Sequence, residues 1–139
     1  MITKIGRPLM KLLKAAYFAN QPVLLVGPHG IGKSQSIESL AHELNIGCEI
    51  YDLSIMEPVD LAGIPVVKQD RLHYAAPKRL PTKGKGILLF EELNRVSKDL
   101  QTACLQICTA RRFNDYALPD GWVPMAAINP PSEDQDNAI

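Results

Sequence analysis

Two short stretches of the chain hold residue types suited to phosphate and divalent-cation chemistry. The first, GPHGIGKS, runs from Gly27 to Ser34 and matches the spacing G-x-x-x-x-G-K-[ST] in full. Glycines in such a loop let backbone N–H groups point inward around phosphate oxygens, and the lysine reaches the same oxygens as a cation. The second, GILLFEELNR, places the adjacent carboxylates Glu91 and Glu92 directly after four apolar residues. Neighbouring carboxylates repel each other, and a bound divalent cation relieves that repulsion.

The flanking elements give the glycine loop its context. Before it, Gln21–Val26 is a short apolar run that we expect to form a buried strand, and after it Lys33–Leu44 repeats its apolar residues at the helical period. A loop between a strand and a helix is the setting in which this pattern binds phosphate, because the helix adds its positive N-terminal end. The alternative is a glycine turn without a ligand, which this setting disfavours. We expect the nucleotide to contact Gly27, Pro28, His29, Gly30, Ile31, Gly32, Lys33 and Ser34.

The expected chemistry divides among four side chains. Lys33 would reach the β- and γ-phosphates, and before nucleotide binds we expect its side chain to be exposed. The Ser34 hydroxyl and the Glu91 carboxylate would hold Mg²⁺, directly or through water. Glu92 would accept a proton from the water that attacks the γ-phosphate. The alternative reading of the acids is a solvated pair at a strand end, which would be preferred if the phosphate loop were missing.

The remaining pattern predicts an α/β fold with a mostly parallel central sheet covered by helices on both faces. Further strands are expected at 48–54, 87–90 and 123–129, and further helices from Pro8 to Asn20 and from Ser97 to Ala110. Two hairpins are expected, over 63–77 with its turn at Lys68-Gln69-Asp70 and over 112–122 with its turn at Pro119-Asp120-Gly121. We expect residues 1–129 to form one domain and 130–139 to be a polar, disordered tail.

Composition limits the classes of partner. The chain has 139 residues, with 15 Lys plus Arg balanced by 15 Asp plus Glu, so its bulk charge indicates neither a nucleic-acid nor a membrane partner. None of its apolar stretches approaches the ~20 residues that span a bilayer. Its three cysteines are odd in number and lack zinc-site spacing, which predicts a reducing, cytoplasmic location.

Two groups of residues have competing interpretations. Arg95, Arg111 and Arg112 could reach a neighbouring subunit's nucleotide, but solvated or salt-bridged roles are favoured. Cys104 and Cys108, four residues apart on one helical face, could bind a metal, but buried free thiols are favoured.

Four ordered stretches, GPHGIGKS, LSIMEPVDLAGIP, GILLFEELNR and MAAINP, resemble the AAA+ ATPases of the MoxR-like, dynein-related branch. The resemblance covers the chain from about its first helix to Asn129 and implies a P-loop NTPase fold, a three-layer α/β/α sandwich with two β-hairpin insertions. It implies that Gly27–Ser34 is the Walker A loop, that Glu91 and Glu92 are the Walker B pair, and that ATP is the nucleotide. Asn129 would be the sensor that helps to orient the attacking water. Homo-oligomeric rings that remodel a protein partner are further implications.

The chain departs from the family pattern in two ways. Walker B usually begins with Asp, and the longer Glu91 could contact the metal directly or impair hydrolysis. The pattern usually continues beyond Asn129 with a helix carrying an arginine finger, a fifth strand and a helical lid, which we do not expect within these residues. Without the fifth strand, Gln21–Val26 would be an apolar edge of the sheet, and irregular self-association is expected.

Three functions therefore remain open. The first is a Mg-dependent ATPase module of a ring that remodels a protein. The second is a nucleotide-binding switch with little or no hydrolysis. The third is a P-loop kinase, which is disfavoured because Asn129 and the FEELNR strand suit water as the nucleophile.

Overall fold

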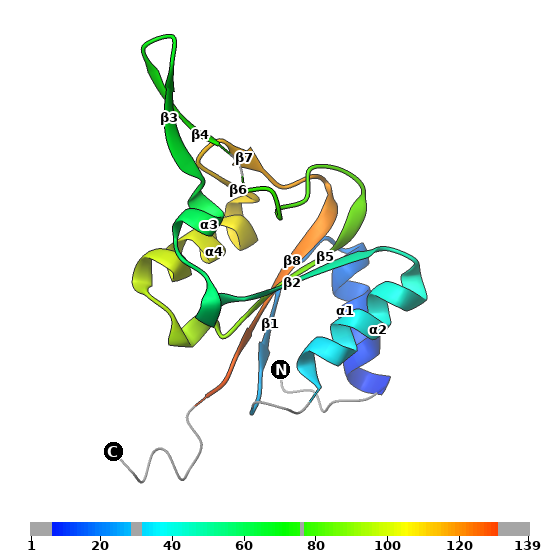
Figure 1. Cartoon of the computed structure of the whole chain (residues 1–139). Helices are drawn as coiled ribbons and strands as arrows, with labels where there is room; N and C mark the ends of the chain where they lie inside the picture. Colours follow the sequence, from blue (N-terminus) through cyan, green and yellow to red (C-terminus); the bar gives the residue numbers. More distant parts are fainter. Residues whose placement is uncertain (1–6, 29–31, 76, 131–139) are drawn as a thin grey trace, which may run out of the picture.

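A four-stranded sheet forms the centre of the computed structural model, in which residues 7–28, 32–75 and 77–130 are described (Figure 1). Its strands lie in the order β1-β8-β5-β2, and each neighbouring pair is parallel. Their bounds are β1 Val23–Val26, β2 Gly47–Asp52, β5 Lys85–Glu91 and β8 Gly121–Ile128. The mostly parallel sheet predicted from the sequence is confirmed.

The two inner strands, β5 and β8, carry the most deeply buried part of the sheet. The side chains of Ile87–Phe90 in β5 are completely inaccessible to solvent. Burying one such side chain contributes roughly 1.5–3 kcal/mol. A strand fixed this firmly provides a rigid support for the residues that follow it.

Helices cover both faces of the sheet, which confirms the predicted three-layer sandwich. On one face lie α1 (Arg7–Phe18) and α2 (Lys33–Leu44), and on the other lies α4 (Lys98–Ala110) (Figure 1). Each face has its own apolar cluster, one built around α1 and α2 and the other around α4. The helix α4 begins where the Ser97 hydroxyl accepts a hydrogen bond from the N–H of Leu100, as expected of an N-cap. The described residues also form three short helices: η1 Leu53–Ile55, α3 Val59–Ala62 and η2 Leu93–Arg95.

Strand β1 differs from its prediction. It pairs with β8 on one side and is the last strand of the sheet on the other. Leu24 and Val26 are 53% and 58% exposed, whereas Leu25 is buried. The expectation of a buried strand was therefore wrong for these two side chains, and the expected position at the edge of the sheet is confirmed.

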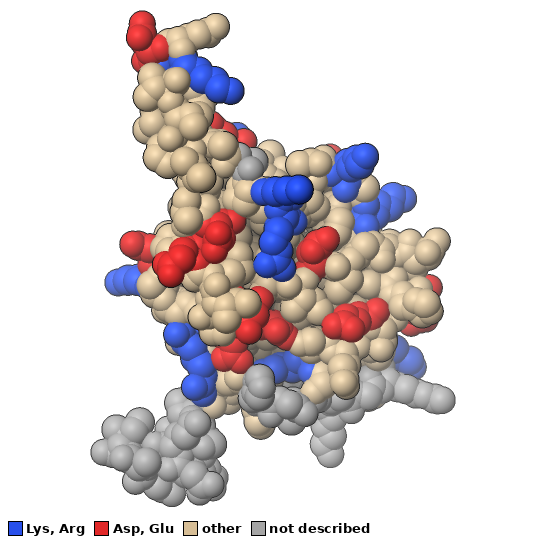
Figure 2. Space-filling view, viewed as in Figure 1, with Lys and Arg blue, Asp and Glu red and all other residues tan. Residues whose placement is uncertain are grey.

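The first predicted hairpin is confirmed. Strands β3 (Ile64–Lys68) and β4 (Arg71–Ala75) pair antiparallel, and both turn residues, Gln69 and Asp70, have positive φ. Positive φ at both central residues defines a two-residue turn whose twist matches the twist of the two strands that it joins. The hairpin projects from the body of the molecule (Figures 1 and 2).

The second hairpin turns at a different place from the predicted one. Strands β6 (Arg112–Phe113) and β7 (Tyr116–Ala117) pair across Asn114 and Asp115. Asn114 adopts a positive φ of 51°, which asparagine tolerates well. The Pro119-Asp120-Gly121 sequence instead makes the bend that leads into β8, where the N–H of Trp122 bonds the carbonyl of Pro119.

Trp122 packs tightly at the start of β8. Its ring lies over Gly86 and Gly47, and a Cβ atom added at Gly86 would come within 2.5 Å of the ring. The indole Nε1–H donates to the carbonyl of Lys83 over 2.9 Å. Trp122 therefore joins the amino ends of β2, β5 and β8.

Charged side chains of both signs are interspersed on the face seen in Figure 2. This distribution agrees with the overall charge balance of the chain. Within the described ranges, none of the helices is long and apolar enough to cross a bilayer.

Candidate nucleotide site

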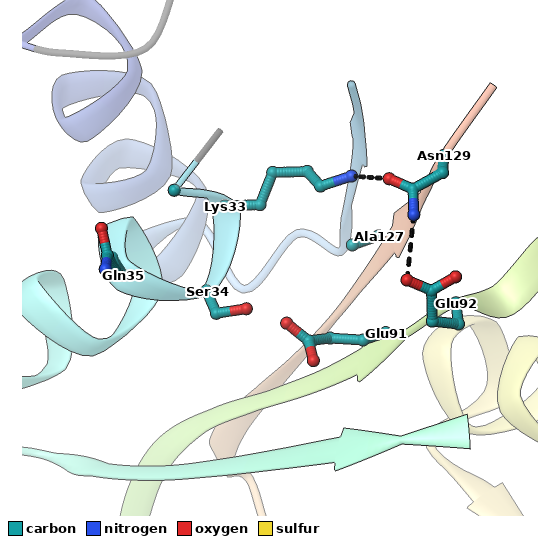
Figure 3. A pocket seen from close by; sticks show the side chains of 8 residues that line it. Lys33, Ser34, Gln35, Glu91, Glu92, Ala127 and Asn129 are labelled. Atoms are coloured by element: carbon teal, nitrogen blue, oxygen red, sulfur yellow. Dashed lines mark hydrogen bonds between the residues drawn. The ribbon is translucent and has the colours of Figure 1, made fainter. Parts of the chain in front are cut away.

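A pocket of about 300 Å³ lies at the carboxyl ends of β5 and β8, beside the amino end of α2 (Figure 3). Ligands of open α/β sheets generally bind at this edge. The residues that line it are Gly32, Lys33, Ser34, Gln35, Glu91, Glu92, Ala127 and Asn129. The structure thus brings together six of the site residues predicted from the sequence, which lie in three separate segments.

The glycine loop is described at its two ends. Gly27 donates its N–H to the carbonyl of Ile128 over 3.2 Å, which fastens the start of the loop to β8. Gly32 is the residue before α2 and has a φ of 84°, a conformation that glycine adopts without strain. Pro28 is exposed. The other predicted loop contacts, His29, Gly30 and Ile31, lie outside the described residues.

The amino end of α2 lies at the pocket and is electropositive. The helix has 12 residues, and its first turn contains no acidic side chain. The first N–H groups of a helix lack partners within the helix, and its dipole favours negative charge there. This end of α2 is therefore suited to an anionic group such as a phosphate.

Lys33 is less exposed than predicted. Its ammonium donates to the carbonyl oxygens of Gly27 and Ile128, at 2.5 and 3.1 Å, and to Oδ1 of Asn129 at 2.6 Å. Burial lowers the pKa of Lys33 from its ordinary value, and the carboxylates of Glu92 and Glu91 oppose that shift. The prediction of an exposed lysine was wrong because main-chain carbonyls at the ends of β1 and β8 lie within its reach.

Asn129 links the lysine to one of the two acids. Among the described residues, Asn129 is the polar residue that is buried in the core, with 6% of its surface exposed. Oδ1 accepts from Lys33, and Nδ2 donates to Oε1 of Glu92 over 2.9 Å (Figure 3). A neutral amide has both a donor and an acceptor, so it can bridge a cation and an anion. An ammonium has donors only, and an ionised carboxylate has acceptors only.

The two glutamates reach the same pocket because the chain turns between them. Glu91 is the last residue of β5, and Glu92 follows with φ 66° and ψ 31°, in the left-handed region. In a continuing strand, consecutive side chains would point to opposite faces. The left-handed residue breaks that alternation, so both carboxylates line one pocket. The second carboxylate also pairs with Arg95, whose Nε lies 3.6 Å from Oε2 of Glu92.

Ser34 and Glu91 point toward one another across the pocket (Figure 3). A hydroxyl and a carboxylate are the hard oxygen donors that Mg²⁺ prefers, and Mg²⁺ commonly completes its shell with substrate phosphates and water. No group of three or more His, Cys, Asp or Glu side chains able to hold a metal exists among the described residues. Ser34 and Glu91 are thus residues of the pocket whose side chains could hold a magnesium ion.

The two cysteines, the salt-bridged Arg95 and the exposed Arg112 follow the favoured interpretations, but Arg111 does not. Arg111 is held within the fold, because its guanidinium donates to the Asn20 side chain and to two main-chain carbonyls. Arg95 is salt-bridged to Glu92. The thiols of Cys104 and Cys108 are free and buried.

Sequence reasoning missed Gln35 and Ala127, which line the pocket, and Asn94, which lies next to it. The Asn94 side chain bonds the main chain of Asn129 at both N–H and C=O. Asn94 lies two residues after the paired acids, but its contact depends on the left-handed turn at Glu92. Such a turn is uncommon for residues other than glycine, so no signal in the sequence indicated the contact.

Comparison with known proteins identifies the family. The family profile of the AAA domain, dynein-related subfamily, matches residues 22–131. The chain belongs to this family. The AAA domain is a nucleotide-binding ATPase module, and the resemblance inferred from the four sequence stretches is confirmed. No curated protein gives a significant match to the sequence.

Solved structures share the fold of this AAA domain. A Cytophaga hutchinsonii protein, with a provisional assignment as an ATPase, matches with a TM-score of 0.66 and 20% identity over 91% of this chain and 39% of its own. NtrX from Brucella abortus matches with a TM-score of 0.59 and 13% identity, over 94% of this chain and 32% of its own. NtrX in complex with ADP matches with a TM-score of 0.61 and 14% identity, over 98% and 32%. The AAA domain described here thus spans about a third to two-fifths of these chains.

Proposed function

We propose that this AAA domain binds ATP together with Mg²⁺ and hydrolyses it. The observation that carries the proposal is the hydrogen-bonded series Lys33–Asn129–Glu92, in a pocket that Ser34 and Glu91 also line. A cation for phosphate, a carboxylate base and an amide that orients them are groups suited to phosphoryl transfer to water. The family supports a nucleotide as the ligand.

Binding would rest on the loop, the helix end and the lysine. The backbone N–H groups of the Gly27–Ser34 loop and the amino end of α2 would surround the phosphates. Lys33 would exchange its present acceptors for the β- and γ-phosphate oxygens, a change of direction that its flexible stem allows. Ser34 and Glu91 would hold Mg²⁺, which neutralises phosphate charge when it is bound.

Hydrolysis would use Glu92 as the base. A water oxygen attacks the γ-phosphorus, the bond from that phosphorus to the β–γ bridging oxygen breaks, and ADP leaves. The Glu92 carboxylate takes the proton that the water loses. Asn129 would hold this carboxylate in place through Nδ2, and it would be the group that orients the water.

At the level of the whole protein, we propose a homo-oligomeric ring in which ATP turnover remodels a protein partner. The family membership motivates this proposal. The free thiols of Cys48, Cys104 and Cys108 motivate a reducing, cytoplasmic location.

The decisive experiment compares Glu92→Gln with the wild-type chain in two assays. Binding of Mg-ATP, followed by calorimetry, should change by less than about threefold, because the amide is isosteric with the carboxylate. Release of phosphate should fall by about 10²–10⁴-fold, the range that a general base contributes. Glu38→Gln, an exposed glutamate on α2, is the matched control and should leave both unchanged.

The alternatives predict different results in the same experiment. A nucleotide-binding switch would bind Mg-ATP with no phosphate release even in the wild type, and a kinase would transfer the phosphoryl group to an added acceptor. Equal phosphate release by Glu92→Gln and the wild type would refute the proposed base.

A further inference from the structure

Asn94 makes an unusual pair of contacts with the residue that follows β8. Its Nδ2 donates to the carbonyl oxygen of Asn129 over 2.6 Å, and its Oδ1 accepts from the N–H of Asn129 over 3.3 Å. One side-chain amide thus binds both main-chain groups of a single residue, 35 positions away in the sequence.

The register of the sheet explains why a side chain, and not a neighbouring strand, binds the main chain of Asn129. The ladder between β5 and β8 runs from Lys85↔Gly121 to Phe90↔Ala126. Beyond it, β5 ends at Glu91 and the chain turns away at Glu92, so the backbone of β5 does not follow β8 to its end. A side-chain amide carries one acceptor and a donor, as a peptide group does. The Asn94 amide therefore takes the place of a further strand residue beside Asn129.

The backbone that Asn94 holds carries the side chain at the centre of the site. Asn129 accepts from Lys33 through Oδ1 and donates to Glu92 through Nδ2, so its amide must keep both its position and its orientation. Asn94 and Glu92 belong to the same turn, and Arg95 of that turn pairs with the Glu92 carboxylate. The contact from Asn94 to Asn129 thus ties the end of β8 to the turn that carries the base.

We propose that Asn94 is a positioning residue, which fixes the main chain of Asn129 so that its amide spans Lys33 and Glu92. The expected effect of Asn94 on turnover rests on the proposed function, ATP hydrolysis. Its effect on the position of Asn129 can be measured without turnover.

The structural measurement is amide hydrogen exchange of Asn129, read by NMR. In Asn94→Ala, exchange of the Asn129 N–H should become roughly fivefold faster, the factor expected from loss of one hydrogen bond of ordinary strength. Gln101→Ala is the matched control, because the Gln101 amide donates to the main-chain carbonyl of Val96, which lies outside β8. Unchanged exchange at Asn129 in Asn94→Ala would overturn the inference, whatever the ATPase rate.

The functional measurement is a double-mutant cycle on steady-state ATP turnover. Asn94→Ala should lower kcat by about ten- to one-hundredfold, as small misplacements of reacting groups do, with KM changed by less than about threefold. In an Asn129→Ala background, Asn94→Ala should lower kcat no further, because a residue that acts through Asn129 loses its effect when that side chain is removed. Asn94→Asp keeps the acceptor but loses the donor, and it should not restore the rate.

The outcomes separate this inference from the proposed function. Additive losses in the cycle, or equal losses in Gln101→Ala, would overturn the positioning role while leaving hydrolysis established. A wild-type chain without turnover would overturn the proposed hydrolysis alone, and the exchange measurement would then decide the role of Asn94.

Discussion

The strongest quantitative prediction concerns replacement of Lys33 by alanine. The ammonium makes three hydrogen bonds at 2.5–3.1 Å, which use its three N–H donors, so at least one of them must be given up before it can contact a phosphate. A hydrogen bond that involves a charged group contributes about 1.5–3 kcal/mol net, so loss of the phosphate contact should weaken ATP binding by roughly ten- to one-hundredfold. The exchange of old bonds for new ones keeps the expected loss from being larger.

The same substitution should also lower stability, which a fully exposed lysine would not do. Removing the donor leaves the carbonyls of Gly27 and Ile128 and the Asn129 side chain short of one partner each. Because the pocket is open to water, which can replace the lost bonds, we expect a loss of about 1 kcal/mol in the free energy of unfolding. Urea titrations of the two proteins measure this difference.

The binding assay is displacement of a fluorescent ATP analogue, with and without Mg²⁺. Lys33→Met separates charge from packing, since it keeps most of the side-chain stem and should bind ATP as weakly as Lys33→Ala. Lys68→Ala, at the exposed end of β3, is the matched control. An affinity of folded Lys33→Ala within about threefold of the wild type would refute the assignment of Lys33 to the phosphates.

Three further predictions follow from the metal donors, the sheet edge and the thiols. Glu91→Gln should weaken the Mg²⁺ dependence of ATP binding, measured by titrating Mg²⁺ at fixed ATP, and behaviour identical to that of Glu92→Gln would contradict separate roles. Leu24→Lys should reduce irregular self-association of the isolated chain, measured by light scattering, because a charge on an edge strand discourages pairing with other chains; equal scattering would contradict a role for this edge. Burial raises the pKa of Cys104, and raises that of Cys108 to about 11. At pH 8 both should therefore resist a thiol reagent until the protein unfolds, and rapid labelling of the native protein would contradict their burial.

Much of the fold could be predicted because its signals are periodic. The apolar repeat in Lys33–Leu44 specified the helix with the bounds that the structure has. The unbroken apolar run at Ile87–Phe90 specified an inner strand, and these four residues are fully buried. The spacing of apolar residues indicates which faces of an element are buried. This signal is strong for an inner strand and for an amphipathic helix.

The errors concern features that periodicity does not record. An apolar run such as QPVLLV does not show whether other elements cover both faces of its strand, and Leu24 and Val26 are exposed. The second hairpin offered two sets of turn residues, and Asn114-Asp115 was used for the turn while Pro119-Asp120-Gly121 was used for the bend into β8.

In the candidate site, the residue types were predictable and their connections were not. Lys33, Glu92 and Asn129 could be named from the spacing and the resemblance. Their hydrogen bonds depend on the left-handed backbone of Glu92 and on where β5 leaves the sheet, which are tertiary outcomes. The contact of Asn94 with Asn129 depends on the same two features.

The packing of Trp122 has a practical consequence for spectroscopy. It is the single tryptophan of the chain, it is 6% exposed, and it lies at the amino ends of the strands, whereas the nucleotide pocket lies at their carboxyl ends. Its emission should therefore report whether β2, β5 and β8 are packed together, and should change little when a nucleotide enters the pocket. A ligand would then shift the midpoint of a fluorescence-monitored unfolding curve only by stabilising the folded state through mass action. The chain thus carries a built-in optical probe of folding whose emission nucleotide binding should not itself alter.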